Sequence, residues 1–298
     1  MKEKSKKNLN TAIKILVSLG LTIYLFSKKV DKTELINNFK IMNWRFLPFI
    51  FLTLIANYVI GAFRWKALLI QKGTEKVSRI YLIKLYFMGA FFNNFMPTSI
   101  GGDVYKMYTL GKKIDSQVIG FSSVFIERFT GILMLALIGL LSMSRNLGFG
   151  VFIILLWTVS GFFIGMNVLR ILSKKIKFLK KIYDALMVYK DRPKVLIYAF
   201  LTSVLIQICA ISTQHLIFMA VGIRLPIFYS LMAFPIITLA GFFVPSINGL
   251  GVQDALYASM FSFVGVSAST AISVSILYHM VRMVTSLIGG VMYALGKD

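Results

Sequence analysis

The residues of this sequence that could do chemistry are charged side chains embedded in apolar segments. Asp103 and Asp254 each follow a glycine-rich stretch, and Glu127 and Arg128 are neighbours well inside an apolar run. A charged side chain inside a membrane costs about 2.5–3.5 kcal/mol on insertion scales unless it is paired or hydrated. Such residues therefore indicate a polar site, where arginine can hold a phosphate group and a carboxylate can balance a cation or act as a general base.

The order of these charges along the chain suggests how they are arranged. Glu127 and Arg128 are adjacent, and adjacent residues on a helix do not face each other, so we expect each to have its own partner. Arg282 lies inside the last apolar segment much as Arg128 lies inside its own, so acids and arginines are predicted to converge near the middle of the membrane. Two other interpretations stay open: the charges form buried salt bridges that lock helices together, or Asp103 and Asp254 cap the helices that follow them.

Two interrupted segments carry most of these residues. Residues 93–113 read NNFMPTSIGGDVYKMYTLGKK and residues 241–257 read GFFVPSINGLGVQDALY, so that proline and glycine break each apolar stretch. The pattern Phe-x-Pro-x-x-x-Gly that begins at Phe95 recurs at Phe243. We interpret this as an internal repeat, because paired apolar segments interrupted by glycine and proline indicate the binding site of a transporter. Two unrelated loops are the alternative.

The composition is that of a polytopic membrane protein. The chain has 298 residues, of which 57% are hydrophobic and 15% charged, against about 45–50% and 25% in soluble domains. Anionic lipid headgroups and orientation signals explain the net charge of +22 better than nucleic acid does. The single cysteine, Cys209, excludes a disulfide framework, and no spacing of Cys, His, Asp or Glu predicts a metal site. No cofactor is expected.

The apolar runs predict six full spans, at about residues 11–26, 46–70, 118–143, 149–169, 195–221 and 268–295. The interrupted segments 85–105 and 228–264 are predicted to be re-entrant hairpins that open to opposite faces. Units 80–143 and 225–296 would then form an inverted repeat. We therefore predict one all-α membrane domain over residues 1–298 with both termini in the cytoplasm. Eight full spans, with both interrupted segments crossing, are the alternative.

The segment 170–194 sets the predicted orientation, because it carries nine basic and two acidic residues and Lys and Arg concentrate on the cytoplasmic side. Apolar residues recur at helical spacing from Ile176 to Met187, with lysines between them. This predicts a basic amphipathic helix over residues 173–192 in the lipid headgroup layer; a solvated loop is the alternative. The basic loop 27–45 fits this topology poorly, because the six-span scheme places it outside, whereas basic loops are expected on the cytoplasmic side.

Three further polar residues lie in predicted spans. Arg64 lies near the end of its span, where a long cation can reach the headgroups, so we expect a structural role for it. His215 and His279 have no acidic neighbours in the sequence. We expect each histidine to bond to a backbone carbonyl rather than to relay protons.

Five motifs in the same order resemble the lysylphosphatidylglycerol synthase transmembrane region, also called the flippase-like domain family. They are GAFRWKALLIQKG, NNFMPTSIGGDVYK, ERFTG, VPSINGLGVQDALY and the stretch from Arg282 to Gly290. The family includes the membrane half of the multiple peptide resistance factor, which moves aminoacylated phosphatidylglycerol between leaflets, and archaeal relatives linked to polyprenyl-lipid glycan pathways. The resemblance implies a lipid flippase-like protein of the prokaryotic cytoplasmic membrane, with a link to antimicrobial peptide resistance.

The family's pattern includes Arg64 and most of the residues already discussed. The predicted substrate-binding residues are Asn94, Pro97, Gly101, Gly102, Asp103, Lys106, Glu127, Arg128, Pro245, Asn248, Gly249, Gly251, Asp254 and Arg282. Two of them depart from the family's pattern: Lys106 stands where Arg is frequent, which removes a bidentate phosphate fork, and Asp254 stands where Glu is usual. Both departures leave the identity of the substrate open, but not the fold.

Lipid translocation is the function that these observations favour, with an anionic or aminoacylated phospholipid or a polyprenyl-phosphate-linked lipid as substrate. The multiple peptide resistance factor has a soluble aminoacyl-transferase domain after its membrane region, and none is expected here, so we expect a transporter that is not itself an enzyme. A separate synthase or transferase is the expected protein partner, a homo-oligomer stays open, and no nucleic acid is expected. The alternatives are a membrane-embedded transferase with Glu127 or Asp103 as general base, and an ion or small-solute transporter.

Overall fold

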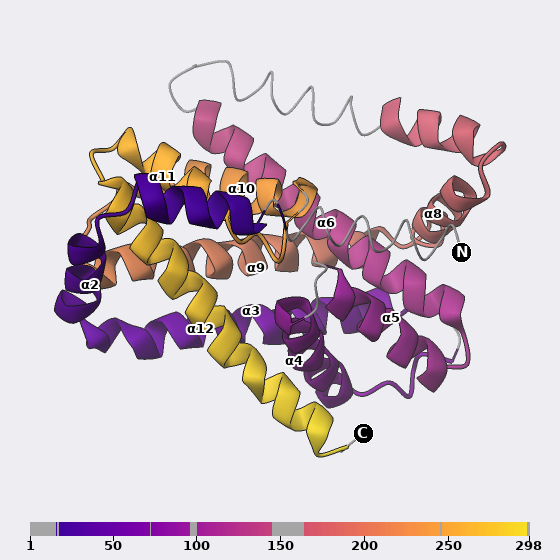
Figure 1. Ribbon diagram of the computed structural model, residues 1–298. Coiled ribbons are helices and arrows are strands. Elements are labelled where there is room, and N and C mark those ends of the chain that lie inside the picture. Colours follow the sequence, from indigo (N-terminus) through magenta and orange to yellow (C-terminus); the bar gives the residue numbers. More distant parts are fainter. Residues whose placement is uncertain are drawn as a thin grey trace.

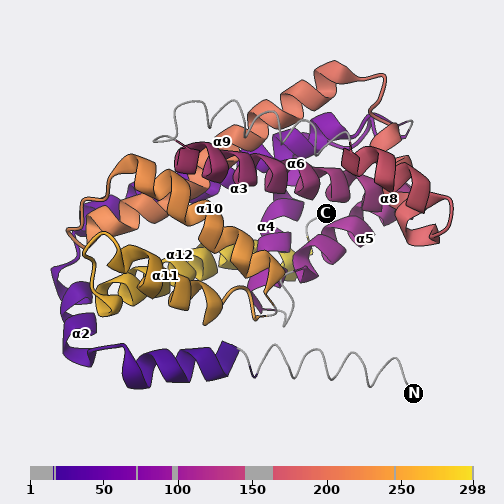
Figure 2. The ribbon, with the colours of Figure 1, turned by 90° about the horizontal axis from the view of Figure 1, so that it is seen from above.

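A computed structural model of the chain describes residues 16, 18–71, 73–95, 100–144, 164–244 and 246–296. Throughout these ranges the regular structure is helical, with no strand (Figures 1 and 2). Helices are the expected solution for such an apolar chain, because a helix satisfies its own backbone N–H and C=O groups where lipid offers no partner. The predicted all-α polytopic membrane fold is therefore confirmed.

Four helices within the described ranges are long and apolar enough to cross a membrane. They are Trp44–Leu68, which joins the short 3-10 helix η1 (Trp44–Phe46) to α3 (Leu47–Leu68), and α6 (Gln117–Met143), α9 (Pro193–Ala220) and α12 (Ala268–Ala294). All four coincide with predicted spans. Helices α3 and α9 pack along each other and form the most extensive helix pair of the fold.

The other two predicted spans lie only partly within the described residues. The span 11–26 is described from residue 18, where a helix runs to residue 28. Of the span 149–169, the described part is the start of the apolar helix Ile164–Ser173. The side-chain hydroxyl of Ser18 accepts a hydrogen bond from the amide of Ile247 at 2.8 Å, so the first helix packs over the second interrupted segment.

Each interrupted segment folds as two short helices that pack against each other. The first consists of α4 (Arg79–Phe95) and α5 (Gly101–Lys113), and the second of α10 (Ile227–Phe243) and α11 (Val252–Ser262). None of these four helices is among those long enough to span. Paired short helices are the arrangement that the hairpin prediction requires, and whether these segments are re-entrant or cross the membrane stays a prediction.

One helix of each interrupted segment packs on a long helix from the other half of the chain. Helix α4 of the first interrupted segment packs on α12, and α10 of the second packs on α6. Within each half, α5 packs on α6 and α11 packs on α12. Figure 1 shows α4 and α12 side by side. As a result, residues from both interrupted segments face the interior that α3, α6 and α9 also border.

Glycines make the closest of these helix contacts possible. A Cβ added to Gly102 of α5 would lie 1.8 Å from the carbonyl oxygen of Gly89 in α4, and one added to Gly289 of α12 would lie 1.9 Å from the carbonyl oxygen of Phe87. Small residues allow backbones to approach this closely in membrane bundles. Helix α4 is thus fixed between α5 and α12, which sets the position of the first interrupted segment.

The predicted amphipathic segment contains α8 (Lys177–Met187), which is shorter than the predicted 173–192. Its Leu186 packs against a core cluster that includes Leu68 and Ile126, while the lysines of the helix are exposed. After α8, the hydroxyl of Tyr189 donates to the carbonyl of Leu68 at 2.7 Å. Burial raises the pKa of Tyr189 to about 12, so this hydroxyl stays protonated as a donor. Its location in the headgroup layer stays a prediction.

We predict that Gly102→Ala destabilises the fold, because its methyl group would overlap the backbone of Gly89. The expected loss in the free energy of unfolding is about 1–3 kcal/mol, as for other overpacked cores. Thermal unfolding of the detergent-solubilised protein measures it. Gly165→Ala is the matched control, since no atom lies within 4 Å of a Cβ there; equal melting temperatures for the two variants would contradict the proposed contact.

Candidate functional site

The centre of the interior holds a chain of ion pairs that begins at Glu127 on α6. Its Oε1 atom lies 3.2 Å from Nη2 of Arg64 on α3, and its Oε2 atom lies 3.1 Å from Nζ of Lys106 on α5. All three side chains are buried. Because α3, α5 and α6 each supply one of these charges, the pairs hold the three helices in one arrangement.

The chain continues through Asp103, one turn before Lys106 on α5. Its Oδ1 atom lies 3.7 Å from Nζ of Lys106, and its Oδ2 atom lies 2.5 Å from Nη2 of Arg128. Five charges therefore alternate in sign, from Arg64 through Glu127, Lys106 and Asp103 to Arg128. The adjacent Glu127 and Arg128 do have different partners, as predicted. Asp103 does not cap α5 as one interpretation proposed, because both of its oxygens face cations.

Aromatic and hydroxyl groups complete the surroundings of the buried cations. The Nζ atom of Lys106 lies 4.0 Å from the ring centre of Tyr86 and 4.9 Å from that of Trp65, and Arg64 donates to the hydroxyl of Ser203 at 2.7 Å. Such contacts offset part of the cost of removing charge from water. Arg128 differs from the others, since 34% of its side chain is exposed.

A second network ties the two interrupted segments together. Arg282 of α12 donates from Nη2 to Oδ1 of Asn248 at 3.0 Å, and Nδ2 of Asn248 donates to Oδ1 of Asn94 at 2.5 Å. The Nδ2 atom of Asn94 then donates to the backbone carbonyl of Arg282 at 3.2 Å. These bonds form a closed ring, which we call the asparagine ring. Among the described residues no carboxylate pairs with Arg282.

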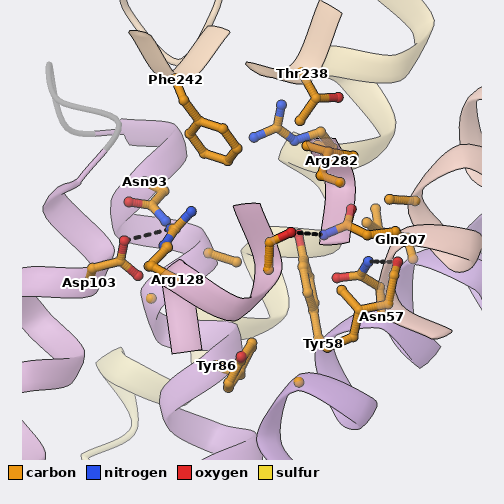
Figure 3. A pocket seen from close by; sticks show the side chains of 18 of the residues that line it. Asn57, Tyr58, Tyr86, Asn93, Asp103, Arg128, Gln207, Thr238, Phe242 and Arg282 are labelled. Carbon is orange, nitrogen blue, oxygen red and sulfur yellow. Dashed lines mark hydrogen bonds and ion pairs between the residues drawn. The ribbon is translucent and has the colours of Figure 1, made fainter. Parts of the chain in front are cut away.

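A cavity of about 250 Å³ joins the two networks. It is lined by residues of α3, α4, α5, α6, α9, α10, α11 and α12 and by Asn248 between α10 and α11. In Figure 3, Asp103 and Arg128 lie on one side of the cavity, and the uncharged residues Asn57 and Gln207 lie on the other. Arg282 lies between the two sides, nearer to Gln207 than Arg128 does. The charged residues that line it are the cations Arg64, Lys106, Arg128 and Arg282 and the carboxylates Asp103 and Glu127. With all of them ionised, two positive charges are in excess.

Half of the predicted binding residues line this cavity, and the others fall into two groups. The lining residues are Asn94, Asp103, Lys106, Glu127, Arg128, Asn248 and Arg282. Pro97 and Pro245 lie outside the described residues. The described residues that do not line it are Gly101, Gly102, Gly249, Gly251 and Asp254. Gly102 closes the contact with α4 instead, and Gly249 and Gly251 have φ angles of +85° and +80°, which favour glycine in the turn before α11.

The predicted binding role of Asp254 is not supported, because its oxygens have other partners. Oδ2 accepts from the amide of Gly251 at 2.8 Å, and Oδ1 accepts from the hydroxyl of Ser275 at 2.5 Å. His279 approaches the same Oδ1 atom at 3.5 Å. Asp254 thus caps α11 from its third residue and ties it to α12, as the capping interpretation proposed for this residue.

Three other sequence-based expectations are wrong. Arg64 does not extend to the headgroups; it is 5% exposed and pairs with Glu127. His279 lies beside Asp254, and Nδ1 of His215 bonds to the hydroxyl of Ser230 at 2.8 Å, so neither contacts a backbone carbonyl as expected. These partners lie on other helices, and the sequence gives no direct sign of which helices meet.

Sequence reasoning also missed the neutral polar residues of the cavity, chiefly Asn57, Gln207, Thr238 and Gln253. One signal was present on α3, where Asn57, Gly61 and Arg64 are spaced by four and three residues and therefore share a helix face. A polar stripe on an apolar helix indicates an inward-facing surface. Among the described residues, no three His, Cys, Asp or Glu side chains converge as a metal site requires.

The comparison with known protein families matches this chain to one of them. The family described as the lysylphosphatidylglycerol synthase TM region matches residues 11–290, a range that includes all the residues that line the cavity. No curated protein and no solved structure gives a significant match.

We predict that Glu127→Gln costs about 3–5 kcal/mol of stability, because it leaves Arg64 and Lys106 buried without their shared carboxylate. Denaturant or thermal unfolding in detergent measures the loss. Adding Arg64→Met to Glu127→Gln should cost less than the sum of the two single changes, since the double variant no longer buries the cation that loses its carboxylate. Glu75→Gln is the control, because Glu75 is an exposed loop residue. Additive losses would show that the pair is not coupled.

Proposed function

We propose that this chain, which belongs to the family of the lysylphosphatidylglycerol synthase transmembrane region, moves the headgroup of an anionic lipid across the membrane. The observation that supports this most directly is a polar cavity lined by four cationic side chains and two carboxylates, enclosed by apolar membrane helices. An isolated excess of charge in such a place is costly. An anionic headgroup that enters the cavity would offset part of the positive charge, while the acyl chains stay in the surrounding lipid.

Arg128 and Arg282 are the residues that we expect to bind the phosphate. Arg128 is the most exposed cation of the ion-pair chain, and among the described residues the guanidinium of Arg282 bonds to the amide of Asn248 and lies 5.3 Å from the ring centre of Tyr278. Guanidinium groups bind phosphate through two parallel hydrogen bonds. Arg64 and Lys106 are already engaged by Glu127, so we assign them to holding the helices in place.

The asparagine ring gives a physical route from binding to movement. A phosphate that bonds to the guanidinium of Arg282 competes with Asn248, and Asn248 holds the second interrupted segment to Asn94 of the first. Releasing one bond of the ring would therefore loosen the contact between the two segments. Rocking or gating of one repeat against the other around a central site is the usual basis of alternating access.

The pairing of the carboxylates favours transport over a transferase reaction. A general base needs a carboxylate that can accept a proton from the substrate, whereas both oxygens of Glu127 and both of Asp103 face cations. We therefore propose a transporter that is not itself an enzyme. The sequence contains no nucleotide-binding motif, so an existing gradient or downhill scrambling would drive the movement.

We further propose the prokaryotic cell membrane as its location, with both termini in the cytoplasm. The basic segment 170–194 would then face the cytoplasmic leaflet, where anionic lipid attracts lysine and arginine. A separate synthase or transferase that supplies the lipid is the expected protein partner.

The experiment that tests this function is reconstitution of the purified chain into liposomes that contain phosphatidylglycerol with a fluorescent acyl chain. Loss of fluorescence to an external quencher reports headgroups that reach the outer leaflet. We predict that Arg282→Gln slows this movement about tenfold or more, since hydrogen bonds to charged groups contribute about 1.5–3 kcal/mol, while the protein stays folded because no carboxylate is left unpaired.

Arg224→Gln is the matched control, because Arg224 is exposed and lies outside the cavity; its rate should equal that of the unmodified chain. Folded protein that moves neither phosphatidylglycerol nor a polyprenyl-phosphate lipid would contradict the proposal. Formation of a covalent lipid product would favour the transferase, and solute uptake without lipid movement would favour the small-solute transporter.

A further inference from the structure

We propose that the cavity selects a lipid phosphodiester whose headgroup carries hydroxyl groups and no positive charge. We propose that the side chain of Gln253 forms hydrogen bonds with those hydroxyl groups. This inference rests on the proposed function for the placement of the phosphate at Arg128 and Arg282. It adds the chemical class of the remaining headgroup and a residue that determines it.

The first argument is that the cavity offers no free carboxylate to an ammonium group. Glu127 is shared by Arg64 and Lys106, and Asp103 is shared by Lys106 and Arg128. Asp254, the other acid near the interrupted segments, lies outside the lining and bonds to Gly251 and Ser275. An ammonium headgroup would therefore enter a site that already carries excess positive charge, without a carboxylate to pair with.

The second argument is that the opposite wall offers neutral acceptors. Asn57 donates its amide nitrogen to the carbonyl of Ile206 at 2.8 Å, and Gln207 donates its own to the carbonyl of Gly131 at 3.0 Å. Each bond uses one of the two amide N–H donors and orients the amide, and within the described residues neither side-chain oxygen has a hydrogen-bond partner. Figure 3 shows both residues across the cavity from Arg128. Acceptors in a positively charged site suit hydroxyl groups, which donate without adding charge.

Gln253 is the strongest of these acceptors, because it is buried and unsatisfied. Its side chain lines the cavity and is 6% exposed, and its Oε1 atom has no hydrogen-bond partner among the described residues. A buried polar atom without a partner costs about 1–3 kcal/mol, most of which a ligand donor would recover. A hydroxyl group suits either end of a side-chain amide, because it can donate to the oxygen or accept from the nitrogen.

Two glycines hold this side chain in position. A Cβ added to Gly241 of α10 would lie 2.4 Å from Nε2 of Gln253, and one added to Gly249 would lie 2.5 Å from its Cδ. The amide therefore passes between two backbone segments that have no side chains there. A side chain that is already fixed in position loses little conformational entropy when a ligand binds. Such pre-organisation favours a role in specificity.

The test compares three short-chain lipids that differ only in the headgroup ester: phosphatidylglycerol, phosphatidylethanol and phosphatidylethanolamine. All three lipids carry the phosphodiester charge. Relative to the ethyl ester, whose headgroup has no further polar group, the glycerol ester adds hydroxyl groups and the ethanolamine ester adds an ammonium group. Binding to the full-length protein in detergent is measured by calorimetric titration, which does not depend on transport. We expect the glycerol ester to bind most tightly and the ethanolamine ester most weakly.

The decisive variant is Gln253→Met, which keeps an unbranched side chain of similar size and removes the amide. It should weaken phosphatidylglycerol binding about three- to tenfold, the range of one neutral hydrogen bond, and leave phosphatidylethanol binding unchanged. Gln117→Met is the control, since Gln117 is exposed and outside the cavity. Equal weakening of both lipids by Gln253→Met would overturn the assignment, as would tighter binding of the ethanolamine ester than of the ethyl ester.

The same lipids in the liposome assay separate this inference from the proposed function. If the three lipids bind with the predicted order of affinity but none of them moves, translocation is refuted and the headgroup assignment is supported. Movement of all three lipids at equal rates, with equal binding, would support translocation and refute the headgroup assignment.

Discussion

The arrangement of this membrane domain depends on four buried charges and the partly exposed Arg128, which cannot be separated at low cost. Arg64, Glu127, Lys106, Asp103 and Arg128 alternate in sign across α3, α5 and α6. Replacing a whole buried ion pair by apolar residues is often neutral, whereas leaving one partner alone is costly. The chain of charges is therefore a poor way to gain stability but an effective way to fix three helices in a single register. That register also places Arg128 at the cavity, where part of its side chain stays accessible.

A second constraint is the packing of helices from one half of the chain on helices from the other. Because α4 packs on α12 and α10 packs on α6, each interrupted segment is held by the long helix of the other half. The backbone contact at Gly289 of α12 allows this for α4. The asparagine ring then joins the segments directly, through Asn94 and Asn248. Rigid helices thus carry the ion pairs, while the two segments meet through a few hydrogen bonds that a ligand can replace.

The cavity combines these two constraints into a site with distinct sides. The ion-pair side supplies positive charge, Asn57 and Gln207 supply neutral acceptors across the cavity from Arg128 (Figure 3), and Gln253 adds a further acceptor to the lining. This division supports a ligand that is anionic at one end and hydroxylated at the other. The family to which the chain belongs contributes the membrane and lipid context. The chemistry of the headgroup follows instead from which carboxylates are already paired.

The sequence by itself determined the class of fold, four of the spans, the two interruptions and the charges of the site. These follow from hydropathy, proline, glycine and the rarity of charge in lipid, which are local properties of the chain. Only the tertiary structure decided which of these residues act together. Arg64 faces Glu127 rather than the headgroups, and Asp254 caps α11 and does not line the cavity. The neutral polar residues of the cavity, including Gln253, were missed for the same reason. Their role depends on which helices pack together, and that packing joins residues far apart in the sequence.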